Sequence, residues 1–378
     1  MSTIVIPAGL KPRDGRFGSG PAKIRPEQLA ALAGSGAAYL GTSHRQPPVR
    51  SLVHRIRGGL AELFSLPADY TVALGNGGTS AFWDMATAGL IREHSQHLSF
   101  GEFSARFAAL AGRAPWLSGP TVVESAPGTH PAPWPESRAD TYALTHNETS
   151  TGVAMPVQRV PGADPGSLIL VDATSAAGGL PVRASEFDVY YFAPQKGLGS
   201  DGGLWIALMS PAAVERVHQI AASGRYIPDF LSLRIALENS AKDQTYNTPA
   251  VTTLFLLADQ IEWMLDQGGL SWTTARTARS AAILYTWAEK AAFADPFVAD
   301  PAQRSQVVGT VDITGDVTGG LSADDIAASL RANGIVDTES YRKLGRNQLR
   351  IGMFPAVDPA DVEALTACID YVAGRVAS

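Results

Sequence analysis

The sequence predicts an α/β protein, with a large domain built on a mostly parallel sheet and a smaller α+β domain after it. Three observations support this prediction. Between residues 70 and 210, short apolar runs alternate with helical stretches. The runs are short and are bounded mostly by Gly, Pro, Asp or Asn, as expected for strands that are buried on both faces of a sheet. From about residue 250 helices dominate, which places a domain boundary near residue 265.

The elements of the large domain follow in chain order. A strand over 70–74 ends in a glycine-rich loop, and a helix over 80–92 comes next. Further strands are expected at 142–144, 168–171, 189–192 and 204–208. Ligands of open α/β sheets bind beyond the carboxyl ends of the strands, so we expect functional residues directly after these runs.

The second part of the chain mixes helices with a few strands. Helices are expected over 252–266 and 273–292, and strands over 306–313 and 349–351. Between these strands a helix begins after the N-cap Ser322 and stops at Gly334. The last helix starts at Pro359, and Cys368 lies beside its apolar face as a core thiol. Two stretches are rich in loop-forming residues, 124–140 and 312–322.

The composition narrows the classes of function. The chain has 378 residues and a net charge of −6, which argues against nucleic acid or an anionic membrane as a partner. One cysteine cannot form an internal disulfide or a four-cysteine zinc site, and the histidines lack metal-ligand spacing, so no metal is expected. No signal peptide and no apolar run of 18 residues stand out, so we expect a cytoplasmic protein. The seven tryptophans, Trp83 among them, are assigned to core and interface packing.

Lys196 and Asp172 carry the strongest chemical signal. Lys196 comes soon after the strand at 189–192, and Asp172 ends the strand at 168–171. A carboxylate at the end of a buried strand needs a charged or hydrogen-bonding partner, and a protonated pyridine nitrogen is such a partner. A lysine amine can form an imine with an aldehyde cofactor and can then move a proton. The pair therefore predicts pyridoxal 5'-phosphate, whose protonated ring accepts electrons from a carbanion.

A glycine-rich loop supplies a third element. Residues 75–80 read Gly-Asn-Gly-Gly-Thr-Ser and lead into a predicted helix. The backbone N–H groups of Gly78, Thr79 and Ser80 at the start of that helix can bind a phosphate. Taken alone, the loop is equally well explained as a tight turn. It is not a Walker loop, because no Gly-Lys-Ser/Thr follows.

In this order, the glycine loop, the aspartate and the lysine match the site of fold-type-I pyridoxal-phosphate enzymes. More narrowly, the chain resembles the phosphoserine aminotransferase family of the class V aminotransferases, in its actinobacterial form. The resemblance covers nearly the whole chain. The segments that carry it are 17–23, 42–45, 146–152, 171–175, 194–197, 247–249 and 350–354.

The resemblance implies a fold and a set of cofactor contacts. The large domain would span 16–265 around a seven-stranded sheet, and 1–15 with 266–378 would form the small domain. Lys196 would hold the cofactor as an imine, and Asp172 would pair with the pyridine nitrogen. The other contacts would be Phe103 stacked on the ring, Thr149 on the ring hydroxyl, and Gln195, Gly78, Thr79 and Ser80 on the phosphate. Asn247 and Thr248 would reach the phosphate of the neighbouring subunit, so the active unit would be a homodimer.

The resemblance also implies the substrates. Arg350 would hold the α-carboxylate, and Arg45 with His44 and Arg342 would hold the distal anion, since arginine binds carboxylate or phosphate in a bidentate manner. The family's usual His-Arg pair is Tyr341-Arg342 here, which leaves the role of Tyr341 open. The implied reaction is a ping-pong transfer of the amino group from L-glutamate to 3-phosphohydroxypyruvate, which gives O-phospho-L-serine and 2-oxoglutarate. This reaction belongs to serine biosynthesis, and by the same family logic pyridoxine biosynthesis is a second role.

Three alternatives compete with this interpretation. An alanine- or serine-glyoxylate aminotransferase shares the fold and the lysine but needs no arginines for a distal anion. A cysteine desulfurase needs a nucleophilic cysteine on a mobile loop, which Cys368 does not match. A non-catalytic binding protein on the same scaffold would be expected to have lost Lys196 or Asp172, and both are present.

Overall fold

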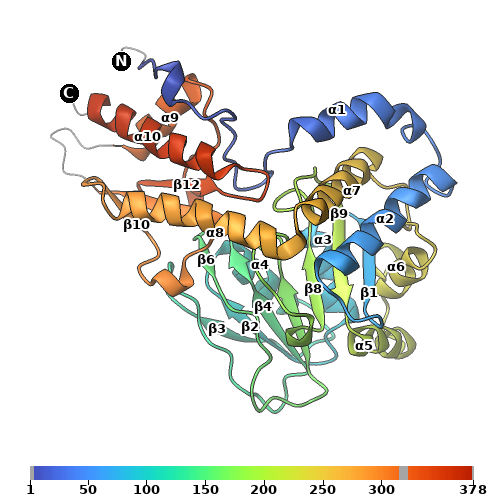
Figure 1. Ribbon diagram of the computed structural model, residues 1–378. Coiled ribbons are helices and arrows are strands. Elements are labelled where there is room, and N and C mark those ends of the chain that lie inside the picture. Colours follow the sequence, from blue (N-terminus) through green and yellow to red (C-terminus); the bar gives the residue numbers. More distant parts are fainter. Residues whose placement is uncertain (1–3, 315–321, 377–378) are drawn as a thin grey trace.

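The computed structural model describes residues 4–314 and 322–376, and a seven-stranded sheet forms its centre (Figure 1). The strands are β1 (Thr71–Asn76), β2 (Ser95–Ser99), β3 (Thr121–Glu124), β4 (Thr141–Thr145), β7 (Leu168–Asp172), β8 (Val189–Phe192) and β9 (Leu204–Met209). They lie in the order β1-β9-β8-β7-β4-β2-β3. Within this sheet β9 alone runs antiparallel to its neighbours, so the prediction of a mostly parallel sheet is confirmed.

Helices bury both faces of this sheet, which explains the continuous apolar runs. Side chains of a strand alternate between the faces. In β1, Val72 and Leu74 join one hydrophobic core, whereas Ala73 joins another. The first core includes α2 (Pro47–Leu63) and α7 (Val251–Asp266), and α1 (Pro26–Ser35) packs beside α7. The second core includes residues of α3 (Thr79–Gly89), α4 (Glu102–Ala111), α5 (Pro211–Ala222) and α6 (Leu233–Ser240).

Two strands of the seven-stranded sheet, β2 and β3, are absent from the sequence prediction for a physical reason. β2 reads Ser-Gln-His-Leu-Ser and is buried along its whole length, so it shows no apolar run. Its polar side chains are hydrogen-bonded instead: Ser95 Oγ lies 3.0 Å from His97 Nε2, and Gln96 Nε2 donates to the Trp134 carbonyl at 3.2 Å. β3 is an edge strand in which half-buried and exposed residues alternate.

The C-terminal part has a hydrophobic core of its own. Its elements are α8 (Gly269–Ala288), α9 (Ala323–Ala332), α10 (Pro359–Val376) and a sheet of β10 (Ala294–Pro296), β11 (Val308–Ile313) and β12 (Gln348–Gly352). Both strand pairs of this sheet are antiparallel. Ile6 and Phe17 from the start of the chain belong to the same core, as does Cys368 on α10. The boundaries proposed at 15/16 and 265/266 stay a prediction.

Several predicted helix ends are confirmed. The Ser322 side chain accepts a hydrogen bond from the Asp325 amide, and α9 begins at the next residue. After α9, Gly334 adopts a φ of 81°, as a helix-stopping glycine does. The helix expected over 273–292 is shifted, since α8 begins at Gly269 and ends at Ala288. Of the loop expected over 312–322, residues 312–313 belong to β11, and 315–321 lie outside the described residues.

Within residues 4–314 and 322–376, each helix is too short or too polar to cross a bilayer.

Candidate active site

A cavity of about 380 Å³ lies beyond the carboxyl ends of β7 and β8, beside the first turns of α3 and α4. Nine predicted site residues line it: Gly78, Thr79, Ser80, Phe103, Thr149, Asp172, Gln195, Lys196 and Arg350. The others that line it are Ser19, Gly20, Trp83, Thr145, Asn147, Thr174, Ser175 and Tyr341. Segments that are far apart in sequence therefore meet where the parallel-sheet rule places a ligand.

Lys196 ends a chain of hydrogen bonds. Its Nζ atom donates to Thr149 Oγ1 at 2.8 Å, and Thr149 Oγ1 donates to Ser175 Oγ at 2.9 Å. Ser175 Oγ in turn donates to the Asn147 carbonyl at 2.8 Å. Thr149 follows the short hairpin strand β5 (Asn147–Glu148), which pairs with β6 (Val153–Ala154). The Lys196 amine is thus hydrogen-bonded to Thr149, the residue predicted to contact the ring hydroxyl of the cofactor.

Burial shifts the titration of both central residues. Burial lowers the pKa of Lys196 to about 8 from its ordinary 10.5, although Asp172 and Glu148 act in the opposite direction. Burial raises the pKa of Asp172, against hydrogen bonds from Thr174 and Trp83 that lower it. The Asp172 carboxylate accepts from the Thr174 amide on Oδ1 at 2.9 Å and from Trp83 Nε1 on Oδ2 at 3.0 Å.

The glycine loop leads directly into α3. Gly77 has a φ of 121°, a conformation that side chains disfavour, and the extended Gly78 is the N-cap. No atom within 4 Å would meet a Cβ at Gly78, so space lies next to the first turn of the helix. Free N–H groups at such a helix start can bind an anion. Thr79 Oγ1 also lies 2.7 Å from Thr174 Oγ1, which ties this turn to the segment after β7.

An aromatic and cationic wall closes another side of the cavity. The Phe103 ring centre lies 5.3 Å from Lys196 Nζ and 6.2 Å from the Tyr341 ring centre. The Arg350 guanidinium lies 5.2 Å from the centre of the Tyr341 ring. Arg350 Nη1 donates to the Thr149 carbonyl at 3.3 Å. Tyr341 therefore contacts both the ring predicted to stack on the cofactor and the arginine predicted to bind a carboxylate.

Glu148 organises the start of α4, which carries Phe103. Its carboxylate is fully buried and accepts from the Ser104 amide at 3.0 Å and the Ser104 hydroxyl at 2.9 Å. It also accepts from the Ser150 hydroxyl at 2.7 Å. A Cβ at Gly101 would lie 2.3 Å from Glu148 Cγ, so only glycine fits there. The anion at the helix start also complements the helix dipole.

Several polar atoms of the cavity are buried without a hydrogen-bond partner. They are Ser19 Oγ, Asn147 Oδ1, Gln195 Oε1 and Arg350 Nε. Buried polar groups are nearly always paired, so these atoms indicate a polar ligand. A group with a charged ring nitrogen, a ring hydroxyl and a phosphate fits the arrangement, since an acid, a hydroxyl and a helix start face the same space.

Five predicted residues do not line this cavity. His44 Nδ1 lies 3.1 Å from Thr248 Oγ1, and the Thr248 carbonyl accepts from Asn76 Nδ2 at 2.9 Å. Asn247 N donates to Asn76 Oδ1 at 3.3 Å. Arg45 is exposed, and so is Arg342 in the short 3-10 helix η6 (Arg342–Leu344). His44, Asn247 and Thr248 thus group beside Asn76 of the glycine loop.

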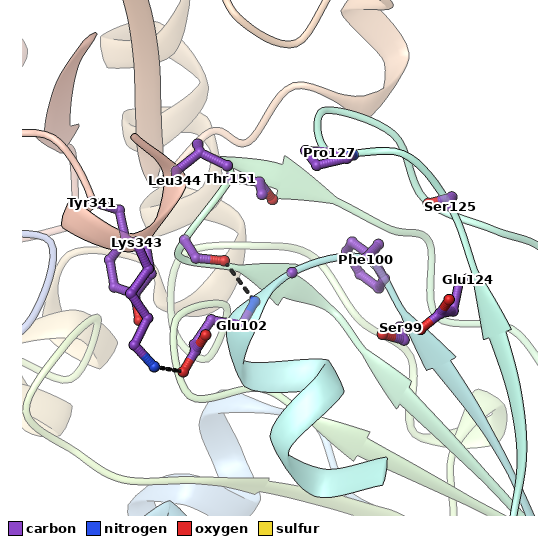
Figure 2. Close-up of a pocket in the computed structure, with 12 residues that line it drawn as sticks. Ser99, Phe100, Glu102, Glu124, Ser125, Pro127, Thr151, Tyr341, Lys343 and Leu344 are labelled. Atoms are coloured by element: carbon purple, nitrogen blue, oxygen red, sulfur yellow. Dashed lines mark hydrogen bonds and ion pairs between the residues drawn. The ribbon is translucent and has the colours of Figure 1, made fainter. Parts of the chain in front are cut away.

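A second, smaller cavity of about 260 Å³ borders the first (Figure 2). Tyr341 lines both cavities. Figure 2 shows the Lys343 ammonium paired with the Glu102 carboxylate. The Glu102 amide donates to the Ser150 hydroxyl at 3.0 Å. The ion pair joins the segment that carries Tyr341 to the first turn of α4.

The parallel sheet, the buried lysine and aspartate, and the helix start define a fold-type-I pyridoxal-phosphate enzyme. Residues 136–365 match the model of the family described as aminotransferase class-V. A phosphoserine aminotransferase from Nocardioides sp. (strain ATCC BAA-499 / JS614) is 62% identical over 368 residues, 97% of each chain. The chain therefore belongs to the class-V aminotransferases, enzymes that use pyridoxal phosphate.

Two further comparisons agree. A protein of Mycobacterium avium (strain 104), provisionally given the same description, is 61% identical over 98% of each chain. The crystal structure of a phosphoserine aminotransferase from Cytophaga hutchinsonii superposes with a TM-score of 0.85 at 23% identity and covers 94% of this chain and 99% of that one. At this identity the superposition supports the fold alone, which is the predicted one.

Proposed function

We propose that this protein is a phosphoserine transaminase that moves the amino group of L-glutamate to 3-phosphohydroxypyruvate, reversibly and by a ping-pong mechanism. Serine biosynthesis in the cytoplasm is the proposed setting, with the related phosphorylated keto acid of pyridoxine biosynthesis as a second substrate. The observation that carries the proposal is Arg350, a largely buried guanidinium at the cavity whose Nε has no partner. A buried arginine with a free donor suits the carboxylate that both amino-acid substrates share.

The chain's own residues can perform the proton transfers. Pyridoxal phosphate, when bound, supplies an electron sink for the substrate α-carbon. We assign Lys196 Nζ as the group that attaches the cofactor and carries the proton at that carbon. With a pKa of about 8, roughly a tenth of the amine is neutral at pH 7, far more than for an ordinary lysine, and this fraction can accept a proton. Asp172 is the acid for the ring nitrogen, and Thr149 is the partner of the ring hydroxyl.

The distal phosphate or carboxylate is assigned to Arg45, His44 and Arg342. His44 contacts Thr248 in the same chain, so residues 44 and 45 would accompany Asn247 and Thr248 to the neighbouring subunit's cavity. The proposal therefore includes a homodimer in which each cavity receives side chains from both subunits. Arg342 lies one residue from Tyr341, which lines the cavity of its own chain.

An activity assay tests the substrate assignment. Purified protein with glutamate and 3-phosphohydroxypyruvate should form phosphoserine and 2-oxoglutarate. Arg45→Ala and Arg342→Ala should each lower kcat/KM for the phosphorylated keto acid about 100-fold, because an arginine–phosphate contact is charge-assisted. Good turnover of glyoxylate with none of phosphohydroxypyruvate, unchanged in both variants, would reject the assignment in favour of a glyoxylate aminotransferase.

A further inference from the structure

We propose that Trp83 is a positioning residue of the active site, whose indole N–H holds the Asp172 carboxylate ionised and aimed at the ring nitrogen of the cofactor. The sequence assigns Trp83 to packing only. The inference rests on the proposed role of Asp172 and adds to it the residue that prepares the acid.

Trp83 and Thr174 supply the hydrogen bonds to the Asp172 carboxylate, Thr174 through both its amide and its side chain. Trp83 Nε1 donates to Oδ2 at 3.0 Å, and the Thr174 amide donates to Oδ1 at 2.9 Å. Trp83 and Asp172 are 3% and 6% exposed, so the indole donates to a carboxylate that is largely removed from bulk solvent. A buried carboxyl group without donors takes up a proton readily, and a protonated acid cannot stabilise a charged ring nitrogen. The indole therefore favours the form of Asp172 that binds the cofactor.

The position of Trp83 on α3 couples this acid to the phosphate end of the cavity. Thr79 begins α3, and Trp83 follows four residues later on the same face, about 6 Å along the helix axis. Trp83 contacts Asp172 at the end of β7, and Thr79 contacts Thr174 just after that strand. The helix α3 thus fixes the relative positions of its first turn, which can bind a phosphate, and of the Trp83 indole, which donates to Asp172.

Among the described residues that line the cavity, Trp83 is the one indole. The Phe103 ring, whose centre lies 5.3 Å from Lys196 Nζ, has no polar atom that could donate to Asp172. Trp83 also stacks on Phe107, with ring centres 6.0 Å apart and an interplanar angle of 12°. A packing role predicts that only the ring matters, whereas a positioning role predicts that the N–H matters.

Cofactor affinity separates these two roles without any substrate. The cofactor-free protein is titrated with pyridoxal phosphate and with the analogue in which carbon replaces the ring nitrogen. Trp83→Phe keeps a ring but removes the donor, and benzothienylalanine at position 83 keeps the bicyclic shape while sulfur replaces the N–H. Each should raise the Kd of pyridoxal phosphate about tenfold and leave that of the analogue within about twofold, because the lost bond acts through Asp172.

Two further variants complete the experiment. Phe107→Leu disturbs the stacking partner and should change both dissociation constants by the same factor. Asp172→Asn should remove the preference for pyridoxal phosphate over the analogue; if the preference persists, the role of Asp172 itself is wrong, and with it that of Trp83. If both position-83 variants change the dissociation constants of the two ligands by the same factor, Trp83 has a packing role only. Because no step involves a substrate, a failed transamination assay leaves this result intact.

Discussion

The Lys196 amine and the Thr149 hydroxyl lie 2.8 Å apart, and the amine is the donor. Because the Thr149 hydroxyl donates its hydrogen bond to Ser175, its oxygen can accept a hydrogen bond from the amine. When the Lys196 amine is neutral, its nitrogen lone pair is therefore not engaged in the hydrogen bond to Thr149. Burial makes the neutral form accessible by lowering the pKa of Lys196 to about 8. A neutral primary amine is the form that can attack a carbonyl carbon.

This lowered pKa predicts a pH-dependent stability of the cofactor-free protein. A lysine whose pKa is lower in the folded than in the unfolded state destabilises the fold at every pH at which the unfolded chain carries its charge. The destabilisation is complete below about pH 8 and disappears as pH rises toward 10.5. Lys196→Met should therefore raise the free energy of unfolding at pH 7 by up to about 3 kcal/mol, and the gain should shrink above pH 8.

Urea unfolding at several pH values measures this effect, with the exposed Lys242 as the control. Lys242→Met should change the free energy of unfolding by less than about 0.5 kcal/mol at every pH. Borohydride reduction of the protein loaded with pyridoxal phosphate, followed by peptide mapping, asks in addition whether the label is on residue 196. A gain for Lys196→Met that does not vary with pH would contradict the lowered pKa.

The predictable and unpredictable parts of the site differ in a physical way. Lys196, Asp172 and the glycine loop follow buried strands, and the sheet's topology brings such positions together wherever the rest of the chain lies. Trp83 gives no such signal, because a tryptophan in an apolar helix has the same pattern whether its N–H is used or not. Glu148 gives no separate signal either, since it is buried by donors that include Ser104, which comes from a distant segment, as well as the nearby Ser150.

The strands show the same division. β7, β8 and β9 are buried along their whole length and, apart from Asp172 at the end of β7, hydrophobic, so their runs are visible in the sequence. β2 is equally buried but polar, and its burial depends on partners such as the Trp134 carbonyl that come from elsewhere in the chain. Hydropathy therefore reveals a buried strand only where the buried side chains are apolar.

Glu148→Gln should destabilise the protein. The carboxylate faces amide and hydroxyl donors on both oxygens. A glutamine NH₂ group would have to face one set of these donors, and an unpaired buried donor costs about 1–3 kcal/mol. Chemical denaturation of the cofactor-free protein measures the loss. The matched variant Glu124→Gln, at an exposed position, should change stability by less than about 0.5 kcal/mol, and an equal loss in both would contradict a specific role for Glu148.

The Lys343–Glu102 ion pair at the edge of the active site predicts a small, salt-dependent coupling. The Lys343 side chain is 69% exposed and that of Glu102 is 21% exposed, so the pair contributes little to overall stability. A double-mutant cycle with Lys343→Gln and Glu102→Gln should give a coupling energy of about 0.2–1 kcal/mol in unfolding experiments at low salt. The coupling should disappear near 1 M salt, because exposed charges are screened. A coupling that is unchanged at high salt would show that the residues interact through packing.

The proposed homodimer makes a prediction about mixed subunits. Lys196→Ala removes the amine, and Asn247→Ala with Thr248→Ala removes side chains proposed to reach the other subunit. Each variant alone should be nearly inactive. A hybrid dimer of the two variants has one cavity with all the substitutions and one cavity with none. In an equal mixture about half of the dimers are hybrids, so random pairing should restore about a quarter of the wild-type activity.

The control for this experiment is a hybrid of Lys196→Ala with Asp172→Ala. Both residues line the same cavity of one chain, so every cavity of that hybrid lacks one of them and activity should not recover. Recovery in the control, or none in the test hybrid, would contradict the shared site. Sedimentation velocity of each mixture confirms that dimers have formed.

The one cysteine should be inert in the folded protein. Cys368 is fully buried on α10 and its thiol lies 3.3 Å from the Leu10 carbonyl, and burial raises its pKa to about 11. At pH 8 its thiolate fraction is then about 200-fold below that of an ordinary thiol, and the reagent must also reach it. Reaction with a chromogenic disulfide should therefore be slow until urea unfolds the chain. Cys368→Ala should keep full transaminase activity, whereas fast native-state labelling together with loss of activity would favour the cysteine desulfurase alternative.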